Sequence, residues 1–364
     1  MVFFVGPLPP PLHGFSAINQ KMLTRLLDRT DVRIFDTTPK HLSDGNKWQL
    51  FFKIFHWLRS FCLFIFLMIV RRPNALYLGM SGGPRQLFDS LYILISRLFG
   101  SNIFVHHHSF AYLNAIKPYN RICMWLAGRS CHIVLCDVMA GKLAAAYGIP
   151  EEQIFILSNA AFLDEEGRFQ NRPEISPDGL TLGFISNITV EKGIVEFFDV
   201  VAGLVQQGLQ VKGVIAGPVD PALQKQFSGM LAGRNDIEYL GPVYGEKKDA
   251  FFQSIDLLLF PTKYQNEAEP VTILEALRDG VPVVAAGRGC IHSMIDQRSG
   301  AVFPNIDQYV ADATEYIKSV MTGSISLNAL SENAFNQFSA MRTCNVARLD
   351  DLITKIAGPK QLTI

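Results

Sequence analysis

Short apolar runs of strand length alternate along the chain with longer stretches of helical periodicity. The first run is VFFVG at 2–6 and the last is GAVFP at 300–304. Strands that alternate with helices predict parallel sheets with helices on both faces. A polar stretch that contains prolines, at 164–179, interrupts the alternation before it restarts. The sequence therefore predicts an α/β protein with two parallel sheets.

Composition and charge agree with a globular chain of two cores. Of the 364 residues, 49% are hydrophobic and 18% are charged. The net charge is zero, but residues 1–165 hold 16 Lys and Arg against 10 Asp and Glu, and the remainder hold 17 against 23. This split argues against nucleic-acid binding and allows the first half to face an anionic surface.

The cysteines and the N-terminus indicate a cytoplasmic setting. The six cysteines form no CxxC or other metal-type spacing. The first strand-like run is not preceded by a charged segment and a cleavage site of the secretory kind. We therefore expect a reducing, cytoplasmic protein.

Two glutamates lie close to a predicted helix start in NEAEPVTILEALRDGVPVV, residues 266–284. In open parallel sheets ligands bind beyond the carboxyl ends of the strands, and Glu267 follows such a strand. Proline favours the first helical position, so a helix is expected near Pro270, with Glu275 a little over one turn along it. The unpaired amides at this helix start would attract an anion, and they belong to Val271, Thr272 and Ile273. A diphosphate fits these amides, and the carboxylates fit sugar hydroxyls on either side; ordinary first-turn acids that stabilise the helix dipole are the alternative.

The E-x7-E spacing, followed by EAL and DGVPVVAA, closely resembles the donor-binding signature of retaining GT-B glycosyltransferases of family 4. The resemblance implies two Rossmann-like domains that face each other across a cleft. It implies that Glu275 binds the nucleotide ribose and Glu267 the transferred sugar. We expect an acceptor-binding domain at 1–166, a nucleotide-sugar-binding domain at 167–340, and a C-terminal helix at 341–364 that could cross back to the first domain.

The segment GFISNITVEKGIVEFF at 183–198 resembles the family's diphosphate-binding segment, in which a lysine follows an arginine by five residues. Lys192 matches the lysine, and Asn187 stands at the arginine position. A hydrogen bond to a charged group contributes about 1.5 to 3 kcal/mol and a neutral one about 0.5 to 1.5. We therefore expect Asn187 to weaken donor binding about tenfold without removing the mechanism.

Two further loops extend the resemblance. GPLPPPLHGFS at 6–16 resembles the family's first loop, which implies donor phosphates near Gly14 and the acceptor near Gly6 and His13. A proline-rich turn without a ligand is the alternative. GPVYGEKKDAFF at 241–252 resembles the loop that meets the nucleobase, with Val243 as the expected contact.

Three consecutive histidines end the predicted strand in NIFVHHHSF, residues 102–110. His106 and His108 share one face of the strand and His107 points away, so the three cannot close on one metal ion. The family usually places a histidine here that hydrogen-bonds the donor sugar. The resemblance implies this role for His108 first and His106 second.

The implied activity is that of a retaining hexosyltransferase, with Glu267, Lys192 and His108 as its catalytic residues. The departing phosphate can take the acceptor proton, so the protein positions the substrates and stabilises the leaving group. No Asp-x-Asp occurs in the sequence, so we expect no metal and no other cofactor. A non-hydrolysing sugar-nucleotide epimerase and a non-catalytic partner subunit are the alternatives.

Residues 48–72 begin as an amphipathic helix, and the apolar run at 61–70 is only half as long as a membrane-spanning helix requires. One interpretation is a core helix that covers the first sheet. The other is a helix that lies against an anionic membrane, since the stretch is aromatic and ends in Arg71 and Arg72. The second interpretation predicts a peripheral enzyme on the inner face of the membrane that extends a glycan or lipid-linked glycan in bacterial-type surface polysaccharide synthesis.

Overall fold

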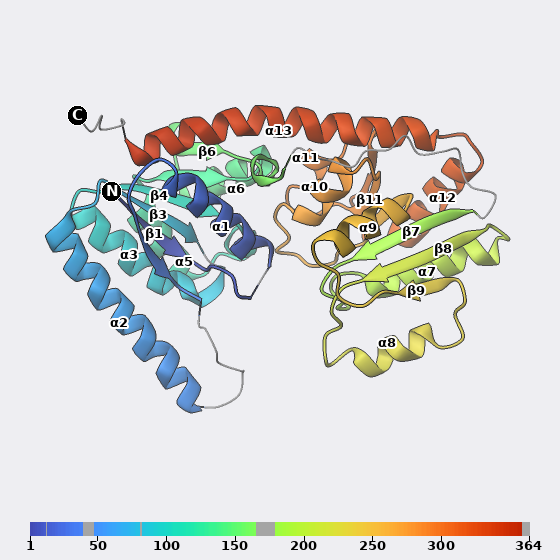
Figure 1. Cartoon of the computed structure of the whole chain (residues 1–364), viewed down its shortest axis with the longest axis horizontal. Helices are drawn as coiled ribbons and strands as arrows, with labels where there is room; N and C mark the ends of the chain where they lie inside the picture. The colour runs from blue at the N-terminus through green and yellow to red at the C-terminus, as the bar shows by residue number, and fades with distance from the viewer. Residues whose placement is uncertain (12, 39–46, 81, 165–178, 359–364) are drawn as a thin grey trace. The chain divides into compact units, whose positions relative to one another are not determined.

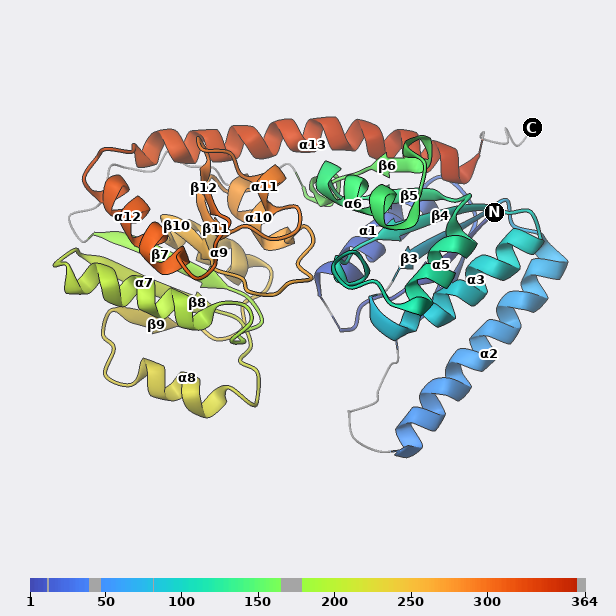
Figure 2. The same cartoon turned by 180° about the vertical axis from the view of Figure 1, so that it is seen from behind.

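Two six-stranded parallel sheets form the framework of the protein (Figures 1 and 2). The computed structural model describes the chain except residues 12, 39–46, 81, 165–178 and 359–364, and for residues 47–56 it describes the backbone alone. The strand orders are β2-β1-β3-β4-β5-β6 and β12-β11-β10-β7-β8-β9. The predicted pair of parallel α/β sheets is confirmed, whereas the predicted linker at 164–179 lies almost entirely outside the described residues.

The chain divides into two compact units, which we call the first and second units. The first unit is Met1–Phe162 with Cys344–Ile364, and the second unit is Leu163–Thr343. A single helix, α13 (Leu327–Ala357), contributes its beginning to the second unit and its end to the first.

The sheet of the first unit is almost wholly buried in its central strands, as is usual for parallel sheets covered on both faces. Its strands are β1 (Val2–Gly6), β2 (Val32–Asp36), β3 (Ala75–Met80), β4 (Asn102–His107), β5 (Cys131–Val134) and β6 (Ile154–Ile156). The helices around it are α1 (Gly14–Leu27), α2 (Lys47–Arg71), α3 (Gln86–Leu98), α4 (Ala111–Asn114), α5 (Pro118–Ala127) and α6 (Asp137–Tyr147).

The strand order decides which face each helix covers. Across the sheet, the chain moves from β1 to β2 in one direction. It then moves from β2 to β3, β4 and β5 in the opposite direction. Because crossovers between parallel strands are right-handed, α1 covers one face, and α2, α3 and α5 cover the other (Figures 1 and 2). On this second face the Phe64 ring of α2 packs against Phe3 of β1 and Phe35 of β2, with ring centroids 5.5 and 5.0 Å apart.

The second unit repeats the arrangement around its own core. Its strands are β7 (Leu180–Ile185), β8 (Val211–Ala216), β9 (Ile237–Tyr239), β10 (Leu257–Phe260), β11 (Val283–Ala286) and β12 (Gly300–Phe303). Its helices are α7 (Ile194–Gln206), α8 (Gln224–Leu231), α9 (Glu246–Ser254), α10 (Val271–Arg278), α11 (Ile291–Met294) and α12 (Tyr309–Met321), followed by α13. Phe184, Phe197 and Leu259 lie in one buried cluster, which joins strands β7 and β10 to helix α7.

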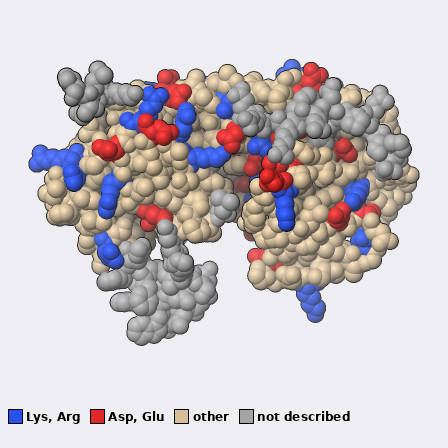
Figure 3. Space-filling model, in the orientation of Figure 1, with Lys and Arg blue, Asp and Glu red and all other residues tan. Residues whose placement is uncertain are grey.

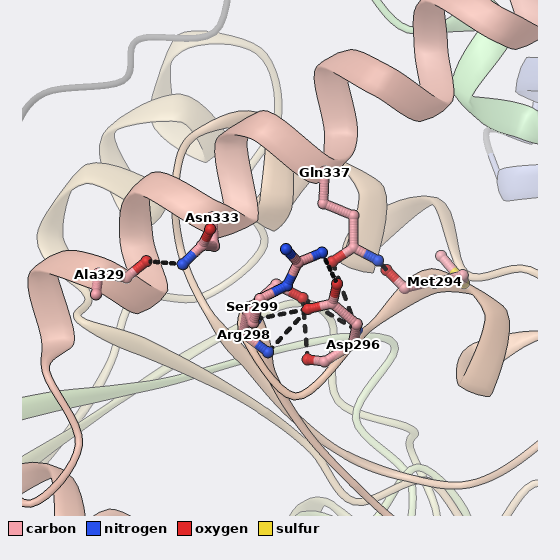
Figure 4. A network of polar contacts seen from close by, with 7 residues as sticks. All are labelled: Met294, Asp296, Arg298, Ser299, Ala329, Asn333 and Gln337. Atoms are coloured by element: carbon pink, nitrogen blue, oxygen red, sulfur yellow. Dashed lines mark hydrogen bonds and ion pairs between the residues drawn. The ribbon is translucent and has the colours of Figure 1, made fainter.

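Polar contacts fix the start of α13 to the loop before β12 (Figure 4). Gln337 donates from Nε2 to the Met294 carbonyl oxygen at 2.9 Å and accepts at Oε1 from the Asp296 amide at 3.4 Å. The Asp296 carboxylate accepts from the backbone amides of Arg298 and Ser299. These bonds hold the loop in one conformation beneath the helix.

The end of α13 makes its own contacts within the first unit. Asn345 accepts from the Ser158 amide at 2.9 Å, in a buried position. Asp350 forms an ion pair with Arg25 of α1 at 2.7 Å. The end of α13 is therefore bound to α1 and to the segment that follows β6.

Candidate functional site

Two loops meet at the carboxyl edge of the second sheet. One follows β7 and the other follows β10, and these strands are neighbours in the sheet. Their approach brings Lys192 and Glu267 together, with Nζ 2.5 Å from Oε2. Thr262 donates to the same carboxylate oxygen at 3.2 Å, and the Lys192 ammonium lies over the Tyr264 ring, 4.9 Å from its centroid. The sequence places these groups on separate loops, and the sheet brings them into one site.

Gly193 makes the approach of these loops possible. It has a positive φ of 87°, and a Cβ atom there would lie 2.0 Å from the Pro261 carbonyl oxygen. A residue with a side chain would therefore push the two loops apart. The Lys263 amide also donates to the Glu191 carbonyl oxygen at 2.8 Å, which fixes the loops side by side.

Helix α10 begins one residue after Pro270, which is its N-cap. The Ile273 amide, predicted to be unpaired, instead donates to the Pro270 carbonyl oxygen at 3.1 Å, because the first turn closes between these two residues. Among the described residues the Val271 and Thr272 amides have no hydrogen-bond acceptor, and both residues are partly exposed. The helix start therefore offers two free amides rather than three.

Glu275 has a partner that the sequence reasoning missed. The Lys248 ammonium of α9 lies 2.5 Å from Glu275 Oε2, and both side chains are mostly buried. The available signal was that Lys248 lies near the start of a helix that follows a strand-end loop. Nothing in the sequence spacing linked this lysine to Glu275. The second unit thus places one ammonium–carboxylate pair just before the start of α10 and another at Glu275 within that helix.

The other predicted residues of the second unit lie in strand-end loops. Asn187 is exposed, two residues after the end of β7. Val243 is buried in the loop between β9 and α9. Both loops leave the same carboxyl edge of the sheet.

In the first unit, the loop after β1 has clear structural roles. Gly6 allows the Asn19 side chain to approach, since a Cβ at Gly6 would lie 2.9 Å from Asn19 Nδ2. His13 is the N-cap of α1, where its Nδ1 accepts from the Ser16 amide at 3.2 Å. Gly14 is the exposed first residue of the helix. These contacts account for the conformation of the loop without a ligand. The donor and acceptor roles predicted for the three residues stay predictions.

His107 lies at the centre of a buried chain of hydrogen bonds. Its Nδ1 is 2.7 Å from the Tyr112 hydroxyl and its Nε2 is 3.0 Å from His132 Nδ1. His132 Nε2 is 3.2 Å from the Ala127 carbonyl oxygen, which can only accept. His132 therefore donates from Nε2, His107 donates from Nε2 to His132, and the Tyr112 hydroxyl donates to His107. Sequence reasoning missed His132 and Tyr112.

His106 and His108 share the opposite face of β4, as alternation along a strand predicts, with ring centroids 4.0 Å apart. His106 Nδ1 is 2.6 Å from the Tyr77 hydroxyl, and the His108 ring packs on Phe15. Neither Nε2 atom has a partner among the described residues, although both atoms are buried. Burial lowers the pKa of both imidazoles, so they are neutral at pH 7.

Over the part of the chain that the structure describes, no group of three or more His, Cys, Asp or Glu side chains is placed to hold a metal ion. Within the same residues, no helix combines the length and the apolarity that crossing a membrane requires.

Two parallel α/β sheets, each with its own helices, define the GT-B class of glycosyltransferase fold. Two solved structures show this likeness across nearly the whole chain. The HepE protein of Anabaena, in complex with UDP, has a TM-score of 0.74 at 16% identity, over 97% of this chain and 98% of that one. WaaG, a glycosyltransferase involved in lipopolysaccharide biosynthesis, has a TM-score of 0.69 at 15% identity, over 99% of this chain and 100% of that one.

The sequence of the second unit matches a known family. Residues 165–337 match the family model of glycosyl transferases group 1. A glycogen synthase of Rhodopseudomonas palustris is 30% identical over 162 residues, which are 43% of this chain and 31% of the relative. An uncharacterized glycosyltransferase of Methanocaldococcus jannaschii is 21% identical over 185 residues, 48% of this chain and 47% of the relative. The chain thus spans less than half the length of these curated relatives.

Proposed function

We propose that the protein transfers a sugar from a nucleotide diphosphate sugar to a glycan or lipid-linked glycan, with retention of anomeric configuration. The observation that carries the proposal is the Lys192–Glu267 pair, with Nζ 2.5 Å from Oε2, at the carboxyl edge of the second sheet. This is where open parallel sheets bind ligands. The complex of HepE with UDP supports a uridine nucleotide as the first donor to test.

The second unit would bind the donor through charge and hydrogen bonds. Lys192 and the free amides of Val271 and Thr272 suit the diphosphate, and the α10 dipole favours the same anion. Glu275 would accept from the ribose hydroxyls with the carboxylate oxygen that Lys248 does not hold. Glu267 would accept from the transferred sugar.

Two further residues complete the donor side. Val243 would meet the nucleobase through its backbone, since its side chain is buried. Asn187 would give the diphosphate a neutral hydrogen bond in place of an arginine contact, which makes this contact weaker.

Catalysis would depend on positioning and charge. The bond between the anomeric carbon and the donor phosphate breaks, and the acceptor oxygen bonds to the same face of that carbon. The departing phosphate takes the acceptor proton, while Lys192 stabilises the negative charge that develops on it. Since the ammonium group supplies this charge, no divalent ion is needed.

To the first unit we assign the acceptor and one contact with the transferred sugar. His108 has a buried Nε2 atom without a partner among the described residues, so a sugar hydroxyl could satisfy it. His106, His13, Gly6 and Gly14 are the remaining candidates, Gly14 for the donor phosphates. We propose that the protein acts at the inner face of a membrane in surface polysaccharide synthesis, as a peripheral cytoplasmic enzyme.

A panel of nucleotide sugars tests the proposal, first for binding and then for transfer to lipid-linked and soluble glycans. We expect one donor to yield a new glycoside with the donor's anomeric configuration. Formation of an epimer without acceptor would support the epimerase alternative. Donor binding without turnover, with activity only after a catalytic partner is added, would support the partner-subunit alternative.

A further inference from the structure

Three helices form a continuous layer on one face of the first sheet. Helix α2 packs on α3 through Phe61 and Phe64, whose ring centroids lie 5.2 and 4.8 Å from that of Tyr92. Helix α3 is joined to α5 by the buried bond from Asn120 Nδ2 to Gln86 Oε1, at 2.6 Å. Figure 2 shows α2, α3 and α5 side by side on this face. Their inner sides cover the sheet, as the core-helix interpretation of residues 48–72 requires.

The outer sides of the same helices are apolar. Trp125 of α5 is 75% exposed, Leu98 of α3 is 72% exposed and Phe66 of α2 is 59% exposed. Single exposed apolar residues are common, but a set that continues over three adjacent helices is not. We call this set the apolar face; it comprises Leu58, Leu63, Phe66, Ile69, Val70, Leu87, Leu91, Leu98, Ile122 and Trp125.

Within each helix these residues recur at helical spacing. Leu87 and Leu91 of α3 are four residues apart, with Leu98 seven residues further, so they form one stripe. Ile122 and Trp125 are three residues apart on α5. The stripes therefore present one broad surface rather than scattered residues.

The charged side chains of the helices that carry the apolar face are cationic, apart from the buried Asp89. Residues 57–130 contain eight lysines and arginines and a single acidic residue, Asp89, which is buried. Arg59, Arg71 and Arg121 are exposed on the helices that carry the face, and Arg72 is exposed directly after α2. On the side of the first unit that carries α1, seen in Figure 3, acidic and basic side chains are mixed. Over residues 57–130, the exposed charged side chains are thus all cations.

We infer that the apolar face binds the surface of an anionic phospholipid bilayer. The apolar side chains would enter the boundary between headgroups and acyl chains, and the arginines would pair with lipid phosphates. A second copy of the chain would instead place cations opposite cations, which is unfavourable. The inference rests on the proposed function, for which it names the surface that meets a membrane carrying the acceptor.

Trp125 provides a direct probe of this surface. A chain with Trp48→Phe and Trp57→Phe keeps Trp125 as its only tryptophan. We expect its emission to shift to the blue with phosphatidylglycerol–phosphatidylcholine vesicles, and brominated lipids to quench it. The shift should be small with phosphatidylcholine alone and should decrease as salt rises. Unchanged emission with both kinds of vesicle would overturn the inference.

Matched variants separate the apolar and the cationic contributions. Phe66→Ser with Leu98→Ser should abolish sedimentation with anionic vesicles. Each of Arg71→Gln and Arg121→Gln should weaken vesicle binding about fivefold, as expected for one cation near an anionic surface. Val205→Ser, at an exposed position of α7 in the second unit, is the control and should leave vesicle binding unchanged.

Nucleotide binding by the same variants distinguishes this inference from the proposed function. All should bind nucleotide like the wild type, because none of the changed residues belongs to the proposed donor site. Normal nucleotide binding with no vesicle binding by the wild type would overturn the inference and leave the proposed function standing. The wild type could instead form concentration-dependent dimers and bind no vesicles. If the double variant Phe66→Ser with Leu98→Ser dissociated these dimers, a second copy of the chain would cover the face, and the inference would be overturned.

Discussion

The Lys192 ammonium and the Glu267 carboxylate form an ion pair, with Nζ 2.5 Å from Oε2, although 75 residues separate them in the sequence. Parallel strands β7 and β10 bring the two loops together, and Gly193 lets them touch. In the proposed reaction, binding of the donor would break this ion pair. The donor phosphate would then contact Lys192, and the donor sugar would contact Glu267.

Lys192→Met should reduce turnover about 100-fold or more, because removing one group that stabilises a developing oxyanion typically costs about that much. The affinity for donor should fall much less than the rate. Steady-state kinetics with saturating donor measures the effect. Lys212→Met is the matched control, since Lys212 forms an exposed pair with Glu238 on the same sheet. Equal losses in both variants would assign the effect to stability.

Glu275→Gln should weaken nucleotide binding about tenfold, because a charged acceptor is replaced by a neutral one. Lys248→Met should weaken binding severalfold by releasing the Glu275 carboxylate from its fixed position. The neighbouring, exposed Lys247→Met should bind like the wild type. Titration calorimetry with nucleoside diphosphates measures all three. Wild-type affinity in Glu275→Gln would exclude this residue from the ribose contact.

Asn187→Arg should strengthen donor binding about tenfold, because it restores a charged contact to the diphosphate. The position is exposed, so the larger side chain can be accommodated. The same change with Lys192→Met should recover part of the lost affinity. Unchanged or weaker binding in Asn187→Arg would place the diphosphate away from this loop.

Activity should be unchanged in EDTA, because Lys192 and the α10 amides supply the charge that a divalent ion would otherwise provide. Turnover after chelation and dialysis, compared with turnover in added manganese, is the measurement. Loss of turnover that manganese restores would show that the reaction requires a metal.

Acid should destabilise the first unit through its buried histidines. Burial lowers the pKa of His132 to about 4 and that of His107 well below the usual 6.5. The unfolded chain therefore binds more protons than the folded chain below pH 6.5, and stability falls as pH falls from there towards 4. Each such histidine costs about 1.4 kcal/mol per pH unit in this range.

Thermal unfolding at pH 7.5 and pH 5 measures this dependence. His132→Gln should make it shallower, whereas the exposed His292→Gln should leave it unchanged. The imidazole NMR signals of His107 and His132 should remain those of neutral rings at pH 5. Equal melting temperatures at the two pH values would contradict the prediction.

The sequence predicted the architecture well because apolar periodicity reports directly on burial. The alternation of runs such as VFFVG and LTLGFI with helices is sufficient for two parallel sheets. It also predicted the start of α10 to within one residue, because Pro270 restricts the local backbone.

Contacts between distant elements were not predictable in the same way. The partner of Glu275, Lys248, comes from a different helix 27 residues away. His132 joins His107 only because β5 lies beside β4. Such pairs depend on where the sheet places each element and on side-chain direction, and neither leaves a periodic pattern. The prediction of a free Ile273 amide was wrong, because the sequence does not show how the first turn of α10 closes.

The most direct test of the account measures nucleoside diphosphate release and product configuration together, with a donor and acceptor from the panel. The wild type should release one nucleoside diphosphate for each new glycoside, and proton NMR should show the donor's anomeric configuration in the product. Lys192→Met and Glu267→Gln should both lose this activity at least tenfold while keeping the wild-type fold. An inverted product, or equal rates in the wild type and both variants, would contradict the account.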